Sequence, residues 1–153
     1  MKPISFTCDE TLPLAPEDIA RQILDLTKWP DFHGYGPVPR IKIAEFEVQT
    51  PGIVGTRIRV TNTDGSSHVE EIVEWQPDQR IRLEFKEFSP PVSRLATRFE
   101  ETWEFQRIGD ETKVTRSFRL HARTRLGKLL LCVISFFLER AIVRNMREMR
   151  TEP

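Results

Sequence analysis

The chain lacks an excess of basic residues and has few cysteines, and these two features exclude several classes of function. Its 153 residues carry 23 basic and 23 acidic side chains, so the formal charge is zero. Because proteins that bind duplex nucleic acid use an excess of Lys and Arg to displace counterions, we expect no nucleic-acid partner. Cysteine is also scarce. Cys8 and Cys132 both stand among apolar neighbours, and we expect buried free thiols rather than a disulfide.

Long apolar runs are absent as well. The longest nearly continuous one, residues 129–138, is too short for a bilayer, which needs about 20 residues. The first ten residues reach Asp9 and Glu10 before any apolar run forms, so we expect no signal peptide and a cytoplasmic location. The length is typical of one domain, and we expect residues 1–153 to form a single one.

No pattern of catalytic or metal-binding residues stands out. His, Cys and carboxylate side chains are not clustered at the short spacings of metal sites, and no Ser-His-Asp or Cys-His arrangement is assembled. His68 and His121 fall on the outward positions of predicted strands, while His33 lies in a loop rich in Gly and Pro. We therefore predict no metal, no cofactor and no catalytic residue.

The order of the predicted elements is the main information that remains. Residues 4–14 alternate like a half-buried strand. Residues 16–26 have the apolar spacing of a short helix, with Pro16 in the first turn, and the Trp29-Pro30 segment ends it. After residue 40, six alternating segments are joined by short connections, which predicts an antiparallel meander with a bulge near residues 44–45.

Two hairpin turns set the predicted registers. If Ile108 and Glu111 flank the turn at Gly109-Asp110, Trp103 lies opposite Arg116 and Glu101 opposite Phe118.

If Thr63 and Ser66 flank the turn at Asp64-Gly65, Val60 lies opposite Val69 and Ile58 opposite Glu71. This register directs Glu71 and Val73 to the inside of the sheet.

Residues 126–149 form one long predicted helix. In its first half the polar positions occupy a stripe only about 40° wide, so we expect that half to be covered on more than one side. In the second half Arg140, Arg144 and Arg147 take over the sector that was apolar before.

The order of a strand, a short helix, a meander and a long last helix resembles the helix-grip fold. The segments that carry the resemblance to this START-like superfamily of Bet v 1 relatives, lipid-transfer domains and polyketide cyclases are 16–19, 26–32, 51–56 and 101–105. The resemblance implies an α+β fold in which a curved antiparallel sheet of about seven strands wraps around the last helix. It also implies an apolar cavity between them.

The predicted inward positions define a candidate ligand-binding site. Glu101 and Arg116 are close enough across their hairpin to form either a structural ion pair or an anchor for the ligand's polar group. Tyr35 belongs to a loop at the expected mouth. The candidate residues are Trp29, Phe32, Tyr35, Ile58, Glu71, Val73, Phe85, Phe99, Glu101, Trp103, Arg116, Phe118, Val133 and Phe137.

Three functions remain open at this point. The first is binding of a hydrophobic small molecule, lipid or polyketide-like. The second is an enzyme of the polyketide cyclase or dehydratase type that uses Glu71, Glu101, Arg116 and Tyr35 in the cavity. The third is an interaction module whose apolar helix joins two subunits, or whose arginines meet an acidic partner or a membrane surface.

Overall fold

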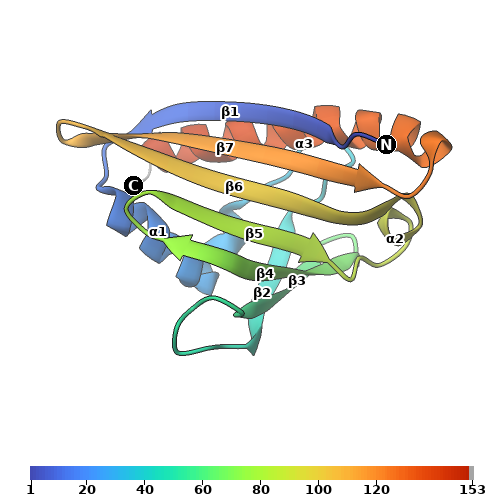
Figure 1. The fold of residues 1–153 in the computed structure, drawn as a ribbon, viewed down its shortest axis with the longest axis horizontal. Helices are drawn as coiled ribbons and strands as arrows, with labels where there is room; N and C mark the ends of the chain where they lie inside the picture. The colour runs from blue at the N-terminus through green and yellow to red at the C-terminus, as the bar shows by residue number, and fades with distance from the viewer. Residues whose placement is uncertain (152–153) are drawn as a thin grey trace.

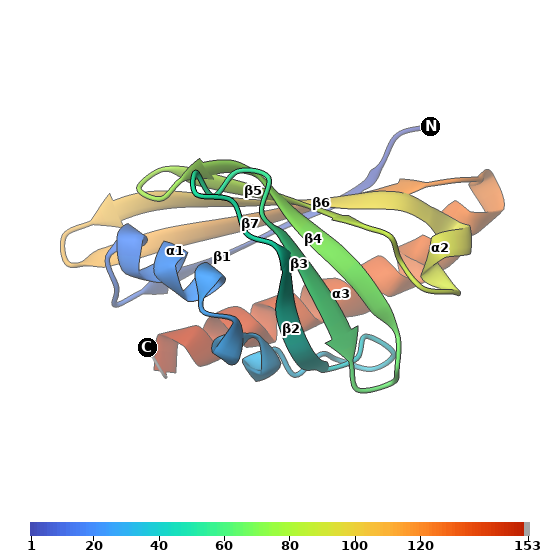
Figure 2. The ribbon, with the colours of Figure 1, turned by 90° about the horizontal axis from the view of Figure 1, so that it is seen from below.

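The computed structural model describes residues 1–151. Seven strands form one antiparallel sheet in the order β1-β7-β6-β5-β4-β3-β2, and the long helix α3 runs beside the sheet, which bends around it (Figures 1 and 2). The predicted α+β helix-grip architecture is confirmed. The elements are β1 Ile4–Leu12, α1 Pro16–Leu24, η1 Leu26–Asp31, β2 Ile41–Val48, β3 Arg57–Asn62, β4 Ser67–Gln76, β5 Arg80–Lys86, α2 Val92–Leu95, β6 Ala96–Ile108, β7 Glu111–Ala122 and α3 Arg125–Thr151.

The segment after β1 forms two short helical elements at one end of the sheet. Helix α1 begins with Pro16 and two acidic residues in its first turn, which suits the positive end of the helix dipole. The Trp29-Pro30 segment is itself a 3-10 helix, η1, in which Asp25 caps the N-terminus by accepting a hydrogen bond from the Thr27 N–H. These elements bring Trp29 to one end of the space between the sheet and α3.

The hairpin of β6 and β7 has the predicted register. Ile108 pairs with Glu111 across the turn, Trp103 lies opposite Arg116, and Gly109 adopts the positive φ of +60° that such a tight turn favours. The inner positions of these two long strands are therefore those that the alternation predicts.

The hairpin of β3 and β4 differs from its predicted register by one residue. Its turn consists of residues 63–65, because the Asn62 N–H donates to the Ser66 carbonyl at 2.8 Å and Gly65 takes a φ of +87°. Ile58 consequently lies opposite Glu70 instead of Glu71. Since neighbouring residues in a strand point to opposite faces, the shift exchanges the inner and outer residues at the start of β4.

This shift makes the predicted inward positions of Glu71 and Val73 wrong. Glu71 lies on the outer face, where its carboxylate is 2.8 Å from Lys86 Nζ and accepts a hydrogen bond from Arg57. The hydrogen bond from Lys86 lowers the pKa of Glu71. Val73 lies at a bulge in the pairing of β4 with β5 and is half-buried outside the cavity. The irregularities of β2 flank the predicted site at residues 44–45, between Ile41 and Ile43 and between Phe46 and Val48.

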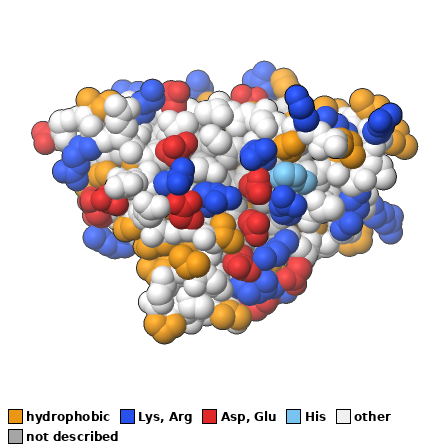
Figure 3. Space-filling model, in the orientation of Figure 1, with side chains coloured by type: hydrophobic (Ala, Val, Ile, Leu, Met, Phe, Trp, Pro, Cys, Tyr) orange, Lys and Arg blue, Asp and Glu red, His pale blue; other side chains and the backbone are white. Residues whose placement is uncertain are grey.

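The outer face of the sheet is covered by alternating acidic and basic side chains (Figure 3). Arg57 and Arg59 both donate to Glu47, which lowers the pKa of Glu47. Farther along the same face, His121 on β7 and Glu100 on β6 form another pair, at 3.1 Å. His121 thus lies on the outward side, as its strand position predicts. Opposite charges across neighbouring strands suit a solvated surface.

Helix α3 packs one face against the sheet and leaves another in solvent. The buried residues of the inner face include Leu131, Leu138, Ile142 and Met146. Cys8 is buried, as predicted, whereas Cys132 is exposed, so the prediction for the second thiol is wrong. Within residues 1–151, no helix combines the length and apolar character that crossing a membrane requires. The exposed apolar residues of α3 are Leu126, Leu129, Leu130, Val133 and Phe136.

Candidate functional site

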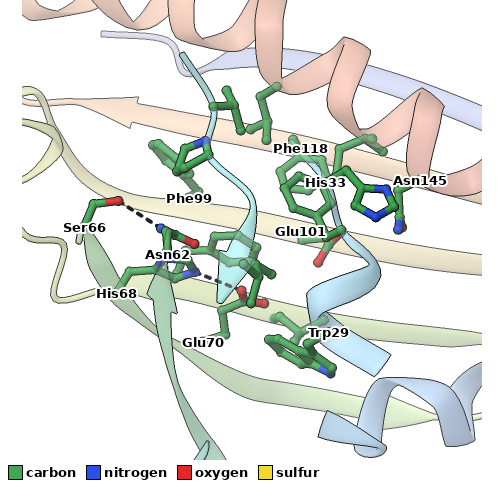
Figure 4. A pocket seen from close by; sticks show the side chains of 18 of the residues that line it. Trp29, His33, Asn62, Ser66, His68, Glu70, Phe99, Glu101, Phe118 and Asn145 are labelled. Carbon is green, nitrogen blue, oxygen red and sulfur yellow. Dashed lines mark hydrogen bonds and ion pairs between the residues drawn. The ribbon is translucent and has the colours of Figure 1, made fainter. Parts of the chain in front are cut away.

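A cavity of about 580 Å³ lies between the sheet and α3 (Figure 4). Its walls come from segments far apart in the sequence: α1 and η1 with the following loop, the tip of the β3–β4 hairpin, residues 88–92, strands β5 to β7, and α3. The sheet, which bends around the helix, supplies the floor. The aromatic residues that line the cavity are Trp29, Phe32, Phe85, Phe88, Phe99, Trp103 and Phe118.

Four phenylalanines form a continuous apolar wall. Phe85 on β5 pairs directly with Phe99 on β6, and their ring centroids are 6.2 Å apart. Phe85 also meets the edge of Phe118 at 5.9 Å, and Phe88 packs on Phe99 at 4.7 Å. These separations lie in the range of favourable aromatic pairs. The wall follows from the alternation of neighbouring strands, which directs every second side chain to the same face.

A buried ion pair lies at the polar end of the cavity. Arg116 on β7 donates from Nε to Glu101 Oε2 at 2.9 Å and makes a second hydrogen bond to the same oxygen through Nη2. Both side chains are less than a tenth exposed. Arg116 also donates to Asn145 Oδ1 on α3 at 3.0 Å, and its guanidinium lies 3.9 Å from the centre of the Trp103 ring. The positive charge is thus fixed between the sheet and the helix and neutralised by Glu101.

A second buried pair consists of His68 and Glu70 on β4. His68 Nε2 lies 2.9 Å from Glu70 Oε2, and the imidazole stacks on Phe85 at 5.1 Å. Burial raises the pKa of Glu70, and the charge of Glu101 adds to this effect, whereas the hydrogen bond with His68 opposes it. The pair therefore places a carboxyl that holds its proton more tightly than usual beside a histidine at the cavity wall (Figure 4).

The loop after η1 covers one side of the cavity. His33 lies 3.0 Å from Glu148 of α3, and residues 37–39 also line the cavity. A bridge between Tyr35 and Val38 closes the loop on itself. Tyr35 is not among the residues that line the cavity and stacks on Phe137 of α3, with 6.2 Å between the ring centroids.

The structure brings most of the predicted site residues together. Those that line the cavity are Trp29, Phe32, Phe85, Phe99, Glu101, Trp103, Arg116 and Phe118. Those that do not line it are Tyr35, Ile58, Glu71, Val73, Val133 and Phe137. Ile58 is fully buried in the core, and Val133 is half exposed on the outside of α3.

His68, Glu70, His33 and Asn145 also line the cavity but are not among the residues predicted from the sequence. The first two were assigned to the wrong positions by the hairpin register, and their prediction requires the turn at residues 63–65 to be recognised as a three-residue turn. His33 was assigned to a surface loop, while Asn145 was one polar residue among several on α3. Among residues 1–151, no group of three or more His, Cys, Asp or Glu side chains is placed to hold a metal ion.

A curved seven-stranded sheet that encloses a cavity with a long C-terminal helix defines a START-like helix-grip domain. The sequence agrees, since residues 3–152 match the family described as polyketide cyclase / dehydrase and lipid transport. The chain belongs to this family. A comparison with curated proteins finds no match.

Solved structures with the same fold come from several sources. TTHA0849 from Thermus thermophilus is 18% identical with a TM-score of 0.71, and the alignment covers 97% of this chain and 98% of that one. A START superfamily protein from Mycobacterium smegmatis is 12% identical with a TM-score of 0.64, over 95% and 98%. BexL, a di-domain ARO/CYC protein from the BE-7585A biosynthetic pathway, is 15% identical with a TM-score of 0.71, over 97% of this chain and 46% of BexL. At these identities the likeness shows the fold alone.

Proposed function

We propose that the protein binds a hydrophobic small molecule, lipid or polyketide-like, in the cavity between the sheet and α3. The observation that carries the proposal is the cavity itself. Its volume of about 580 Å³ falls within the roughly 300–1,000 Å³ of small-molecule sites. Its mostly apolar wall and few convergent polar side chains are also typical of such sites.

The polar groups restrict the chemistry of the ligand. Arg116 is already neutralised by Glu101, so an anionic group on the ligand would bring an excess negative charge into a buried region. Burial raises the pKa of Glu70, so this wall of the cavity also disfavours an added negative charge. A neutral oxygen, in a carbonyl or hydroxyl group, therefore fits this end of the cavity better than a carboxylate, while the aromatic wall accommodates rings or an acyl chain.

The family supports this proposal in general terms, because its description includes lipid transport. A direct test is mass spectrometry of an organic extract from the purified protein, combined with native mass spectrometry of the intact complex. We expect an apolar compound without a carboxylate, bound in a ratio of about one to one. The proposal fails if the extract contains no such compound and the protein binds none from a panel of neutral lipids and aromatic polyketides.

A second candidate function is catalysis of the cyclase or dehydratase type, which the family description also includes. The observation in its favour is the His68–Glu70 pair at the cavity wall. A histidine held by a carboxyl group can remove a proton from the carbon next to a carbonyl group, and the resulting negative charge passes to the carbonyl oxygen. Return of that proton to a hydroxyl group on the neighbouring carbon releases water and completes a dehydration.

The two functions are distinguished by His68→Asn. If the protein is an enzyme of this type, the variant loses turnover of a β-hydroxy ketone substrate at least a hundredfold but still binds it. If the protein is only a carrier, wild type and variant both bind the compound and return it unchanged.

A further inference from the structure

We propose that the exposed apolar side of α3 docks on an anionic membrane surface. We call this side the α3 face and define it as Leu126, Leu129, Leu130, Val133 and Phe136. Each of these side chains is at least half exposed. The proposal goes beyond ligand binding in the cavity and does not depend on what the cavity holds.

The five residues form one continuous stripe. At 100° per residue they fall within a sector of about 120°, and from first to last they extend about 15 Å along the helix. The stripe lies apart from the buried side of α3, where Leu131 and Leu138 pack toward the sheet. Large exposed residues of this kind, gathered on one helix, are typical of an interaction surface rather than of scattered surface hydrophobics.

Basic residues continue the same stripe. Arg140, Arg144 and Arg147 fall within its sector in the following turns, and the Arg140 guanidinium lies 4.5 Å from the centre of the Phe136 ring. At the other end, a shallow hollow beside Leu129 is bordered by Lys2, Arg125 and Lys128.

The acidic residues of α3 do not offset these charges on the stripe. Within residues 125–151, Glu139 falls outside the sector, near enough to Cys8 to raise the pKa of that thiol, and Glu148 at the edge is paired with Arg144 and His33. An apolar centre with arginine and lysine at both ends matches a bilayer, where leucine and phenylalanine enter the interface and basic side chains reach anionic headgroups.

A lipid surface fits the α3 face better than a second copy of the chain. A stable dimer interface usually needs roughly 20–30 residues on each side, far more than the few apolar side chains of this single helix. A bilayer has no such requirement, because it deforms around a narrow apolar ridge and solvates the arginines at its surface.

The α3 face also borders the loop that covers one side of the cavity. Phe137 falls in the same sector of α3 but is half-buried, and Tyr35 from this loop stacks on its ring. A docked helix therefore brings the loop of residues 33–39 close to the lipid. A ligand that leaves the cavity beneath this loop would enter the bilayer without crossing water.

Co-sedimentation with vesicles tests the proposal. We expect the full chain to bind phosphatidylcholine vesicles that contain about 30% phosphatidylglycerol, and to bind pure phosphatidylcholine at least tenfold more weakly. Leu129→Ser/Phe136→Ser should weaken binding at least tenfold. Each of Arg140→Gln and Arg147→Gln should weaken it about fivefold on anionic vesicles only. The matched control is Val54→Ser/Ile108→Ser, which alters two side chains that are as exposed as Phe136 but lie elsewhere, and which should bind like wild type.

The thiols provide an independent measurement. Cys132 is exposed beside the α3 face while Cys8 is buried, so a thiol-reactive fluorophore attaches at Cys132 without any substitution. Its emission should shift to shorter wavelength when anionic vesicles are added.

Equal vesicle binding by wild type and the Leu129→Ser/Phe136→Ser variant overturns the proposal. A second result would also overturn it: wild type does not bind vesicles, and its mass in analytical ultracentrifugation rises with concentration but that of the variant does not. The α3 face would then be a contact between two copies of the chain. Binding of a fluorescent apolar probe in the cavity, measured without vesicles, should be the same in both proteins. A failure of docking is thereby separated from a failure of the proposed ligand binding.

Discussion

At the scale of single residues, the Arg116–Glu101 pair is the most consequential contact. Both groups are buried, and removal of one leaves the other as an unpaired charge. We predict that Arg116→Met lowers the free energy of unfolding by about 3–5 kcal/mol, because Glu101 then lacks its partner. The double variant Arg116→Met/Glu101→Leu should recover most of this loss, since it leaves no charge behind. Urea unfolding of the three proteins, wild type and the two variants, measures both values.

The same variants show whether the pair also contacts the ligand. If Arg116 and Glu101 anchor a polar group, the double variant folds but binds the extracted compound at least tenfold more weakly. If the pair is only structural, binding by the double variant is unchanged. An equal loss of stability in the single and double variants would contradict the argument from an unpaired charge.

The raised pKa of Glu70 predicts that this residue destabilises the fold as the pH rises, which is the reverse of the usual effect of a carboxylate. Its pKa is raised by burial, so between the unfolded pKa of about 4.3 and the folded pKa the native state binds more protons than the unfolded chain. The contribution of Glu70 to stability is therefore fully present below the unfolded pKa and is lost as the pH rises through the folded pKa. We predict that Glu70→Gln removes this loss, so that the variant gains stability relative to wild type as the pH rises above the unfolded pKa of about 4.3.

The neighbouring residue is the control. Hydrogen bonding to Lys86 lowers the pKa of Glu71, and its contribution to stability is present above the unfolded pKa and is lost as the pH falls through the folded pKa. Glu71→Gln should therefore lose stability relative to wild type at neutral pH and approach it in acid. Unfolding curves at several pH values measure both effects. If the stability of the two variants relative to wild type changes in the same direction with pH, Glu70 does not lie inside with Glu71 outside.

At the scale of elements, the two hairpins show what the sequence can and cannot predict. Alternation and a Gly-Asp turn were sufficient to predict the register of β6 and β7, including the contact of Glu101 with Arg116. The segment from Asn62 to Ser66 permits both a two-residue and a three-residue turn, and alternation alone does not choose between them. Here a shift of one residue placed His68 and Glu70, in place of Glu71, at the cavity.

The loop of residues 33–39 depends on glycine at position 34. Gly34 has a φ of +73°, and a Cβ there would lie 2.2 Å from the Val38 carbonyl oxygen. We predict that Gly34→Ala displaces this loop from the cavity entrance and accelerates ligand release at least tenfold, measured by stopped-flow fluorescence. Gly52→Ala is the control, because a Cβ at Gly52 meets no atom within 4 Å, and it should release ligand like wild type. Equal release rates in the two variants would show that the loop does not control the entrance.

At the scale of the whole molecule, the order of the elements was predictable and the shape of the cavity was not. Inward alternation identified the aromatic wall, from Phe85 to Phe118, because periodicity reports which face a side chain occupies. It does not report how far two faces lie apart. Ile58 and Phe99 both point inward, yet Ile58 is enclosed in the core while Phe99 borders the cavity. That difference depends on the curvature of the sheet, which many distant contacts determine together.

The cavity predicts an unusual tolerance to a larger side chain. Adding bulk to a well-packed core usually costs about 1–3 kcal/mol. Leu138 borders the cavity, so the larger side chain of Leu138→Trp can extend into empty space. We predict that this variant melts at or above the wild-type temperature but binds the neutral probe N-phenyl-1-naphthylamine at least tenfold more weakly. Val133→Trp, which introduces the same side chain on the exposed side of α3, should bind the probe inside the cavity like wild type.

The two measurements together distinguish a hollow interior from a filled one. If the space between α3 and the sheet is a ligand site, the indole of Leu138→Trp fills part of it. The melting temperature then stays the same or rises while the affinity for the probe falls. If the variant instead melts well below wild type and still binds the probe, the indole has been forced into packed side chains. The probe would then occupy a surface site, and the carrier function would lose its structural basis.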